Sequence, residues 1–316
     1  MRVGITVTDF SWPAPAAEMG ATIARIAERA DEAGFDSIWT MDHFFQIRIS
    51  GRPPESPMPE AYTTLAFMAA HTRRIRLGVA VASVAYRNPG VLVKTATTVD
   101  VLSGGRTIFG IGAGAPFDRL PDGVSPRDVE TYGLGIPMPP LAERFERLEE
   151  ALQIAHRMWS GDESPYTGRH YRLERPLNSP NTLQRPHPPI MIGGSGERKT
   201  LRLVAQYADM CNLFDLQGTG FRDDLRHKLD VLRRHCDDVG RDYAEIEKTT
   251  ATLRLDDSRD GLDALLDHLR ELAAIGIDHV VIGPREPWTE ASLGLLASAV
   301  DEIHAIPVAG RPVAAG

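Results

Sequence analysis

The sequence predicts an α/β fold: a (β/α)8 TIM barrel with insertion loops after strands two and four and before strand five. Three observations predict this fold. Apolar runs alternate eight times with segments of helical period along the chain. Several runs end on polar or glycine-rich residues, where barrel enzymes carry their chemistry. The length of 316 residues also suits a barrel, which takes about 250 residues plus insertions.

The predicted strands are continuous apolar runs, as expected for parallel strands that helices cover. In order they span Val3–Thr8, Ser37–Met41, Ile75–Ala82, Thr107–Gly112, Pro189–Gly193, Asp209–Phe214, Ile246–Leu253 and His279–Gly283. Between them, apolar residues recur at the helical spacing of three and four, which predicts helices packed on the outside. These helical faces include Ile23, Ile26, Ala27 and Ala30; Leu141, Phe145, Leu148, Leu152, Ala155 and Trp159; Leu201, Val204, Ala205 and Ala208; Leu225, Leu229 and Leu232; and Leu293, Leu296, Ala297 and Val300.

Three proline-rich stretches interrupt the alternation: Gln46–Pro59, Ala115–Pro140 and Ser164–Pro188. Long loops of this kind are usually functional, and the first two follow strands, so we expect them to roof the mouth of the barrel and one of them to act as a mobile lid. We predict a single barrel domain over residues 1–306 and a frayed C-terminal tail over 307–316.

Composition limits the class of protein. Hydrophobic residues make up 42% and charged residues 25%, and the net charge of −8 argues against a nucleic-acid surface. No apolar run is long enough to span a membrane, and a strand is predicted from Val3, so we expect neither a signal peptide nor a membrane partner. Cys211 and Cys236 lack metal or redox spacing, which predicts reduced thiols in a cytoplasmic protein.

The second strand ends on Asp42-His43, the first candidate for chemistry. A histidine at the end of a barrel strand can donate a proton to a substrate or hold a cofactor ring, and Asp42 can orient a cofactor hydroxyl. The alternative is a capped strand end with a surface histidine. The histidines show no ligand spacing, so no metal site is predicted.

Glycines mark the other candidate positions. Small residues inside the third strand, Leu77–Val84, suggest a close approach by a flat group or tight helix packing. Gly110–Ala115 satisfies the dinucleotide fingerprint, but Pro116 follows at once, so backbone exposed beside a ring is a better explanation. Gly193–Gly196, with Arg198 and Lys199, precede a predicted helix and suit a phosphate, although Ser195 could instead be only an N-cap.

Aromatic and polar residues near other strand ends are candidates for substrate contacts, with lid packing as the alternative. They are Phe10, Trp12, Phe44 and Phe45, accompanied by Asp9 and Asn212.

The motifs together resemble the luciferase-like monooxygenase superfamily, in particular actinobacterial oxidoreductases that use coenzyme F420. The resemblance covers nearly the whole chain and is carried by Ala33–Gln46, Arg74–Pro89, Val101–Arg106, Glu143–Leu152, Gln184–Ile190, Ile192–Glu197 and Thr200–Ala205. It implies a homodimer and a barrel that binds a flavin or deazaflavin at its C-terminal mouth. It also implies a cis peptide at Ala80-Val81, Asp42 and His43 beside the ring, Ser83, Ala113 and Gly114 lining it, and Gly193–Gly196 at the phosphate.

The chain departs from the related F420-dependent sugar-phosphate dehydrogenases at two positions. Ile47 and Ala115 stand where those enzymes have a tryptophan and a glutamate, which argues against their substrate. Glu130 or Tyr132, in the long stretch after strand four, is a candidate replacement for the missing acid.

The resulting hypothesis is an F420-dependent oxidoreductase that transfers hydride between the deazaflavin C5 and a C=C, C=N or C=O of a small organic substrate. Two alternatives stay open: an FMN-dependent monooxygenase that uses O2, and a barrel that binds a flavin without catalysis.

Overall fold

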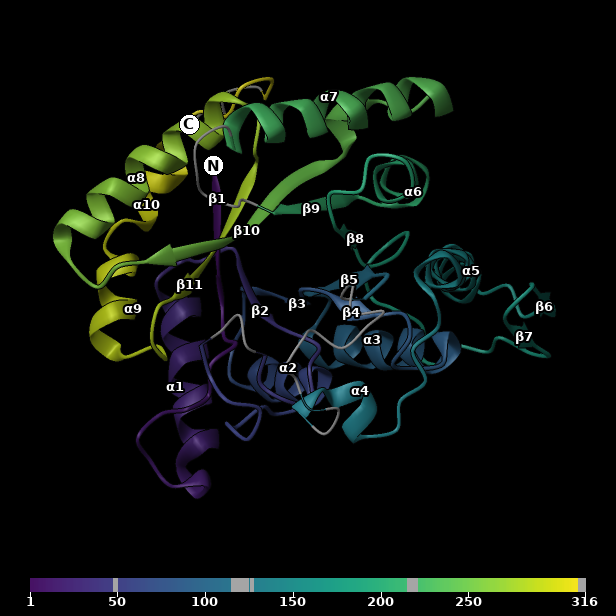
Figure 1. Ribbon diagram of the computed structural model, residues 1–316, viewed down its shortest axis with the longest axis horizontal. Coiled ribbons are helices and arrows are strands. Elements are labelled where there is room, and N and C mark those ends of the chain that lie inside the picture. The colour runs from purple at the N-terminus through teal and green to yellow at the C-terminus, as the bar shows by residue number, and fades with distance from the viewer. Residues whose placement is uncertain (48–50, 115–124, 126–127, 215–220, 312–316) are drawn as a thin grey trace.

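The computed structural model describes residues 1–47, 51–114, 125, 128–214 and 221–311 (Figure 1). Its main sheet is a closed ring of parallel strands. The order is β3-β2-β1-β11-β10-β9-β8-β5, and a further pairing of β3 with β5 closes it. The strands are β1 (Arg2–Thr6), β2 (Ser37–Thr40), β3 (Arg76–Val79), its continuation β4 (Ala82–Ser83), β5 (Thr107–Gly112), β8 (Ile190–Gly193), β9 (Met210–Phe214), β10 (Glu247–Leu255) and β11 (His279–Pro284). The predicted barrel is therefore confirmed.

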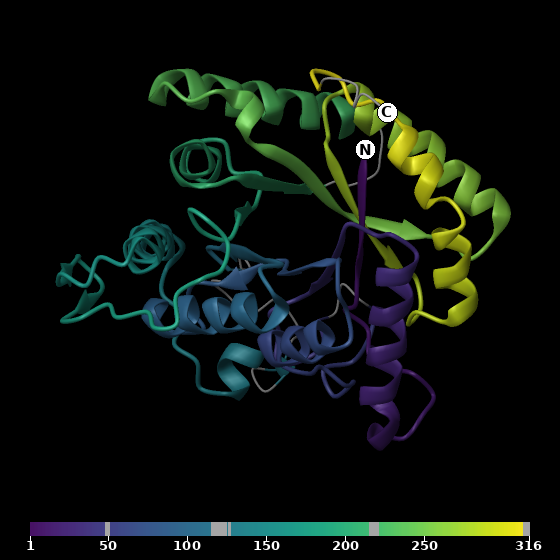
Figure 2. The same ribbon diagram turned by 180° about the vertical axis from the view of Figure 1, so that it is seen from behind.

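Helices surround this ring in both views (Figures 1 and 2). They are η1 (Ala16–Glu18), α1 (Met19–Glu32), α2 (Ala61–Ala70), α3 (Pro89–Ser103), α4 (Glu130–Gly133), α5 (Leu141–Ser160), α6 (Thr200–Tyr207), α7 (Phe221–Val239), η4 (Tyr243–Glu245), α8 (Arg259–Ala274), α9 (Glu290–Ala297) and α10 (Val300–Ala305). The apolar stripe of α1 is buried as predicted. The last predicted helix is divided, because α9 ends before Ser298 and α10 begins at Val300.

Local sequence explains where α3 begins and ends. The Asn88 side chain accepts a hydrogen bond from Gly90 N (3.0 Å), and Pro89 occupies the first turn, where no backbone N–H is needed. Gly104 follows the helix with φ 73°, a left-handed conformation that favours glycine. This helix start fixes the loop that carries Tyr86 and Arg87 between β4 and α3.

Glycines allow the barrel interior to pack. Trp39, Ile108, Met191, Met210 and Val281 form one buried cluster of strand side chains. A Cβ on Gly78 would lie 2.2 Å from the Trp39 indole, and a Cβ on Gly110 would lie 1.9 Å from the Val79 carbonyl oxygen. The Trp39 indole is therefore one flat group that lies close to the third strand, at Gly78. Gly110 and Gly112 are buried, so the expectation that they expose backbone beside a ring is wrong for these two residues.

A series of hydrogen-bonded polar side chains extends from Trp39 of this cluster. The Trp39 indole N–H donates to Ser37 Oγ (2.6 Å), which lies 2.8 Å from His279 Nε2. His279 Nδ1 in turn contacts Glu247 Oε1 at 2.8 Å, and Arg2 and Arg76 pair with the same carboxylate. Burial alone would raise the pKa of Glu247, but the His279 hydrogen bond and charge, with Arg76 and Arg2, hold that pKa well below 4.5.

This carboxylate makes stability depend on pH. Because folding depresses its pKa, its contribution is fully present above the unfolded value near 4.5 and is lost as pH falls through the folded value. We expect Glu247→Gln to cost about 3–5 kcal/mol of unfolding free energy at pH 7, since it leaves buried partners unpaired. Urea titrations should show that the difference in unfolding free energy between the variant and wild type becomes smaller at acid pH. A difference that does not depend on pH would refute this role of Glu247.

The segment after residue 306 is ordered as far as Arg311, in contrast to the predicted frayed tail. Arg311 binds Asp278 through Nε (2.7 Å) and a second nitrogen (2.9 Å), and it donates to the carbonyl oxygens of Ala244 and Ile246. Residues 312–316 lie outside the described part of the chain.

The insertions also contain regular structure. The segment before β8 holds an antiparallel pair, β6 (Tyr166–Thr167) with β7 (Arg172–Leu173), which projects beside α5 (Figure 1). The segment after β5 holds α4. The lid prediction concerns Gln46–Pro59 and Ala115–Pro140, of which residues 48–50, 115–124 and 126–127 lie outside the described ranges, and it stays a prediction. No helix in the described residues is both long and apolar enough to cross a bilayer.

Candidate active site

Asp42 lies two residues after the end of β2 and is 4% exposed. Its Oδ2 accepts hydrogen bonds from Ser83 N (3.0 Å) and from an Arg87 nitrogen (2.7 Å). Its Oδ1 is buried and has no hydrogen-bond partner among the described residues. A buried carboxylate oxygen without a donor is costly, so a donor from a bound group would stabilise this position.

Sequence reasoning missed Arg87 as a site residue. Arg87 bridges Asp42 and Glu60 (2.5 Å), and its guanidinium lies over the rings of Phe44 (5.7 Å) and Tyr62 (5.5 Å). Burial alone would lower the pKa of Arg87, but the two carboxylates outweigh burial and raise it above its ordinary value. The available signal was its position: an arginine between the end of strand three and the Asn-Pro that starts α3.

Glu130 is the partner of His43. His43 Nδ1 lies 2.6 Å from Glu130 Oε1, and the His43 side chain is 20% exposed. The same oxygen accepts from Tyr86 Oη (2.5 Å), while Oε2 accepts from the backbone N–H groups of Phe44 (2.5 Å) and Phe45 (3.4 Å). Although burial alone would raise the pKa of Glu130, the hydrogen bonds from His43, Tyr86 and Phe44 hold it below its ordinary value. Glu130 is therefore an ionised, buried carboxylate; Tyr132, the other predicted acid, is 52% exposed.

The cis peptide expected at Ala80-Val81 is present, between β3 and β4. Val81 methyl carbons would lie 2.8 Å from a Cβ on either Gly112 or Gly193, so these glycines let β5 and β8 approach Val81 closely. Ser83 and Gly114 are also adjacent, because a Cβ on Gly114 would lie 2.7 Å from Ser83 Oγ. The Ala113 carbonyl accepts from the buried Arg144 (2.9 Å). Ser83, Ala113 and Gly114, which are predicted to line the ring, thus gather at the carboxyl ends of β4 and β5, and Val81 lies close to the end of β8.

The segment Gly193–Arg198 leads into α6, which begins only at Thr200 with Lys199 as its N-cap residue. Ser195 is not the cap, because its Oγ accepts from Phe214 N (3.3 Å). Gly194 N is bonded to Asn212 O (3.0 Å). By contrast, the N–H groups of residues 195–198 have no acceptor within the described ranges. Free N–H groups before a helix suit an anion, so the arrangement fits a phosphate.

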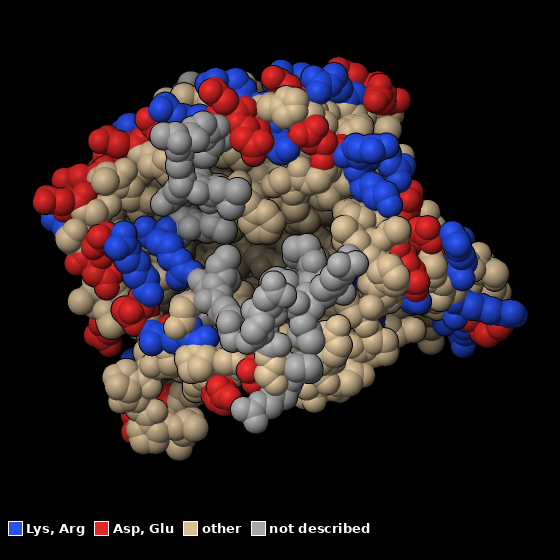
Figure 3. Space-filling model, in the orientation of Figure 1, with Lys and Arg blue, Asp and Glu red and all other residues tan. Residues whose placement is uncertain are grey.

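Of the predicted substrate residues, Phe10 is buried, whereas Trp12, Phe44 and Phe45 are half-buried. Phe10 is 2% exposed in the hydrophobic core, and the Trp12 indole donates to the Trp288 carbonyl (2.9 Å), so both contribute to packing. Phe44 packs against Tyr86 with ring centroids 5.4 Å apart. The face of the molecule seen in Figure 3 is hollowed near its centre. Within the described residues, no cluster of three histidine, cysteine or acidic side chains could hold a metal.

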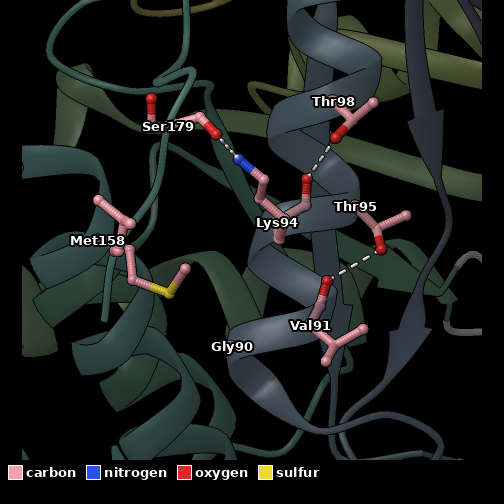
Figure 4. Close-up of a pocket in the computed structure, with 8 residues that line it drawn as sticks. Gly90, Val91, Lys94, Thr95, Thr98, Met158 and Ser179 are labelled. Atoms are coloured by element: carbon pink, nitrogen blue, oxygen red, sulfur yellow. Dashed lines mark hydrogen bonds between the residues drawn. The ribbon is translucent and has the colours of Figure 1, made fainter. Parts of the chain in front are cut away.

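A second hollow, of about 490 Å³, lies outside the barrel between α3, the end of α5 and residues 177–179 (Figure 4). Its only charged lining residue, Lys94, donates to the Ser179 carbonyl (2.5 Å). It therefore offers no candidate chemistry.

Comparison with known proteins agrees with this geometry. A protein of Nakamurella multipartita named F420-dependent glucose-6-phosphate dehydrogenase is 31% identical over 204 residues, covering 63% of this chain and 54% of that protein. The chain thus spans about half the length of this relative.

Two solved structures share the fold. An F420-dependent secondary alcohol dehydrogenase in complex with an F420-acetone adduct gives a TM-score of 0.76 at 15% identity, covering 96% of this chain and 98% of that one. The monooxygenase RslO1 from Streptomyces bottropensis gives 0.73 at 21% identity, covering 96% and 100%. The family model described as luciferase-like monooxygenase matches residues 1–275. The chain belongs to the luciferase-like monooxygenase family.

Proposed function

We propose that this protein is an F420-dependent oxidoreductase acting on a small organic substrate. The observation that carries the proposal is that the barrel mouth presents two complementary unpaired groups: the buried Asp42 Oδ1 and the free N–H groups of residues 195–198. The first suits a hydroxyl or N–H donor of a flat ring system, and the second suits its phosphate. Relatives and structural neighbours named for F420 support this choice.

Within this proposal each residue has a distinct task. Asp42 orients the cofactor, while Ala80, Val81, Ser83, Ala113 and Gly114 support its ring. Gly193, Gly194, Ser195, Gly196 and Arg198 hold its phosphate. Bound F420 supplies the carbon that exchanges hydride with a C=C, C=N or C=O. His43 gives or takes the accompanying proton through Nε2, since Nδ1 is held by Glu130. Phe44 and Phe45 contact the substrate.

Glucose 6-phosphate is not the substrate that we propose, because Ile47 and Ala115 replace the residues expected for it. Ala115 itself lies outside the described ranges. The alternative activity is an FMN-dependent monooxygenase, which the likeness to a monooxygenase structure favours.

Titration of the purified protein with F420 and with FMN, followed by fluorescence quenching, tests the proposal. We expect F420 to bind more tightly, and Arg198→Gln to weaken that binding by up to roughly fivefold, the range of an exposed ion pair. Arg175→Gln, which alters an exposed arginine paired with Glu163, is the matched control and should change nothing. Tight binding of FMN without affinity for F420 would reverse the ranking.

We also propose a cytoplasmic homodimer, as the resemblance implies. Both cysteines are free thiols, in keeping with a reducing compartment. Exposed apolar side chains on α3 and on the adjacent residues 177–184 suit a second copy: Val91, Leu102, Leu177 and Leu183. Sedimentation equilibrium of the purified chain should give twice the mass of 34.7 kDa, and a monomer at micromolar concentration would exclude the dimer.

A further inference from the structure

We propose that Glu130 is a positioning residue that fixes the proton of His43 on Nδ1 and keeps Nε2 free to exchange a proton with the substrate. This inference rests on the role proposed for His43 in the preceding section. It replaces the expectation that Glu130 itself contacts the substrate, because Glu130 is only 7% exposed and both of its oxygens are engaged by the protein.

The groups that are hydrogen-bonded to Glu130 determine which atoms carry the protons. The backbone N–H groups of Phe44 and Phe45 can only donate. Tyr86 donates as well, since burial and the Glu130 charge raise its pKa and keep it protonated. An ionised carboxylate can only accept. Therefore the contact of 2.6 Å requires a proton on His43 Nδ1 in either charge state of the ring.

The consequence falls on the other ring nitrogen. In the neutral ring, Nε2 carries a lone pair and can accept a proton; once protonated, it can return that proton while Nδ1 stays bonded to Glu130. No described residue forms a hydrogen bond or ion pair with Nε2. The ring's exposed fraction of 20% gives it access to the mouth of the barrel.

One carboxylate also joins three loops. Glu130 belongs to the insertion after β5, His43 to Phe45 follow β2, and Tyr86 follows β4. The insertion thus supplies the acid that the usual position, Ala115, lacks. Glu130 contacts His43 rather than the substrate, and it fixes both the orientation and the tautomer of the histidine ring.

Nitrogen NMR of the cofactor-free protein with 15N-labelled histidine tests this directly. His43→Asn assigns the His43 resonances among the 10 histidines by their loss. We expect the neutral wild-type ring to show a protonated Nδ1 and an unprotonated Nε2. A wild-type ring protonated at Nε2 would overturn the proposal, whatever cofactor the protein binds. Failure of F420 to bind would instead remove the proposed function and leave this result standing.

Glu130→Gln provides the second test. Its amide oxygen can satisfy Phe44 N–H, and its NH2 group then faces His43 Nδ1, which forces the proton to Nε2. We expect kcat to fall at least about tenfold, with an altered pH–rate profile and little change in the KM for cofactor. An unchanged tautomer and profile would contradict the proposal.

Glu150→Gln is the matched control. Glu150 is likewise a buried carboxylate that accepts backbone N–H groups, here from Arg169, His170 and Tyr171 on the outer hairpin. Its substitution should reduce stability without altering either the His43 resonances or the pH–rate profile. A loss of turnover as large as that of Glu130→Gln would mean that destabilisation, and not positioning, explains both variants.

Discussion

Replacing His43 with alanine is expected to lower turnover by about 10²- to 10⁴-fold, the usual contribution of a positioned acid or base. His43 Nε2 has no hydrogen-bond partner among the described residues, and alanine removes the ring that carries it. Asp42, which lies next to it, remains bound to Arg87 and Ser83, so cofactor affinity should change little. Steady-state kinetics and a cofactor titration measure the two effects separately.

Two further variants separate chemistry from structure. His43→Asn keeps an N–H donor near Glu130 but removes Nε2, so it should be as inactive as His43→Ala and more stable. His71→Ala, which removes a half-exposed histidine paired with Glu28 on the outer helices, should keep wild-type turnover. If His43→Ala turned over at the wild-type rate, the proton would have to come from elsewhere.

Replacing Gly110 with alanine is expected to lower the free energy of unfolding by about 3 kcal/mol or more, at the upper end of overpacking effects. The added Cβ would lie 1.9 Å from the Val79 carbonyl oxygen and 3.3 Å from Met191 Cε. The oxygen belongs to the backbone of β3, which pairs with β5 and cannot move away without opening the ring of strands. Relief of this clash would therefore require β3 and β5 to separate, which opens the barrel.

Gly294→Ala is the matched control for this substitution. Gly294 lies inside α9, has no positive φ, and has no atom within 4 Å of the position of an added Cβ. There alanine should stabilise the protein by about 0.5–1 kcal/mol, because glycine is the weaker helix former. Urea midpoints of the two variants should move in opposite directions. Equal stability of Gly110→Ala and wild type would show that β3 and β5 tolerate separation.

The strands could be predicted because each is an uninterrupted apolar run. Thr107–Gly112 agrees with β5 at both ends, and the others differ by one or two residues, where hydrogen bonding rather than hydrophobicity decides the boundary. The third predicted strand is split into β3 and β4 around Ala80-Val81, a feature that the family resemblance, and not periodicity, anticipated.

The contacts between the side chains of the site could not be predicted from the sequence. Glu130 contacts His43 although the two residues are 87 positions apart in the sequence. Glu130 lies in a proline-rich insertion that lacks the hydrophobic periodicity from which its place could be predicted. The pairing of Arg87 with Asp42 depends on the turn before α3, and the burial of Phe10 depends on packing by distant elements. Residue types therefore indicated where the chemistry lies, whereas only the folded chain shows which groups are already engaged.

The buried chain of Ser37, His279 and Glu247 has the residue types and the spacing of a hydrolase triad. Its serine oxygen already accepts the Trp39 indole proton, and both Ser37 and His279 are 0% exposed. Acyl substrates and phosphonate labels have no route to this oxygen. A geometric search for serine esterases would therefore select this barrel wrongly, although the three residues serve only to hold the Trp39 indole in place inside the barrel.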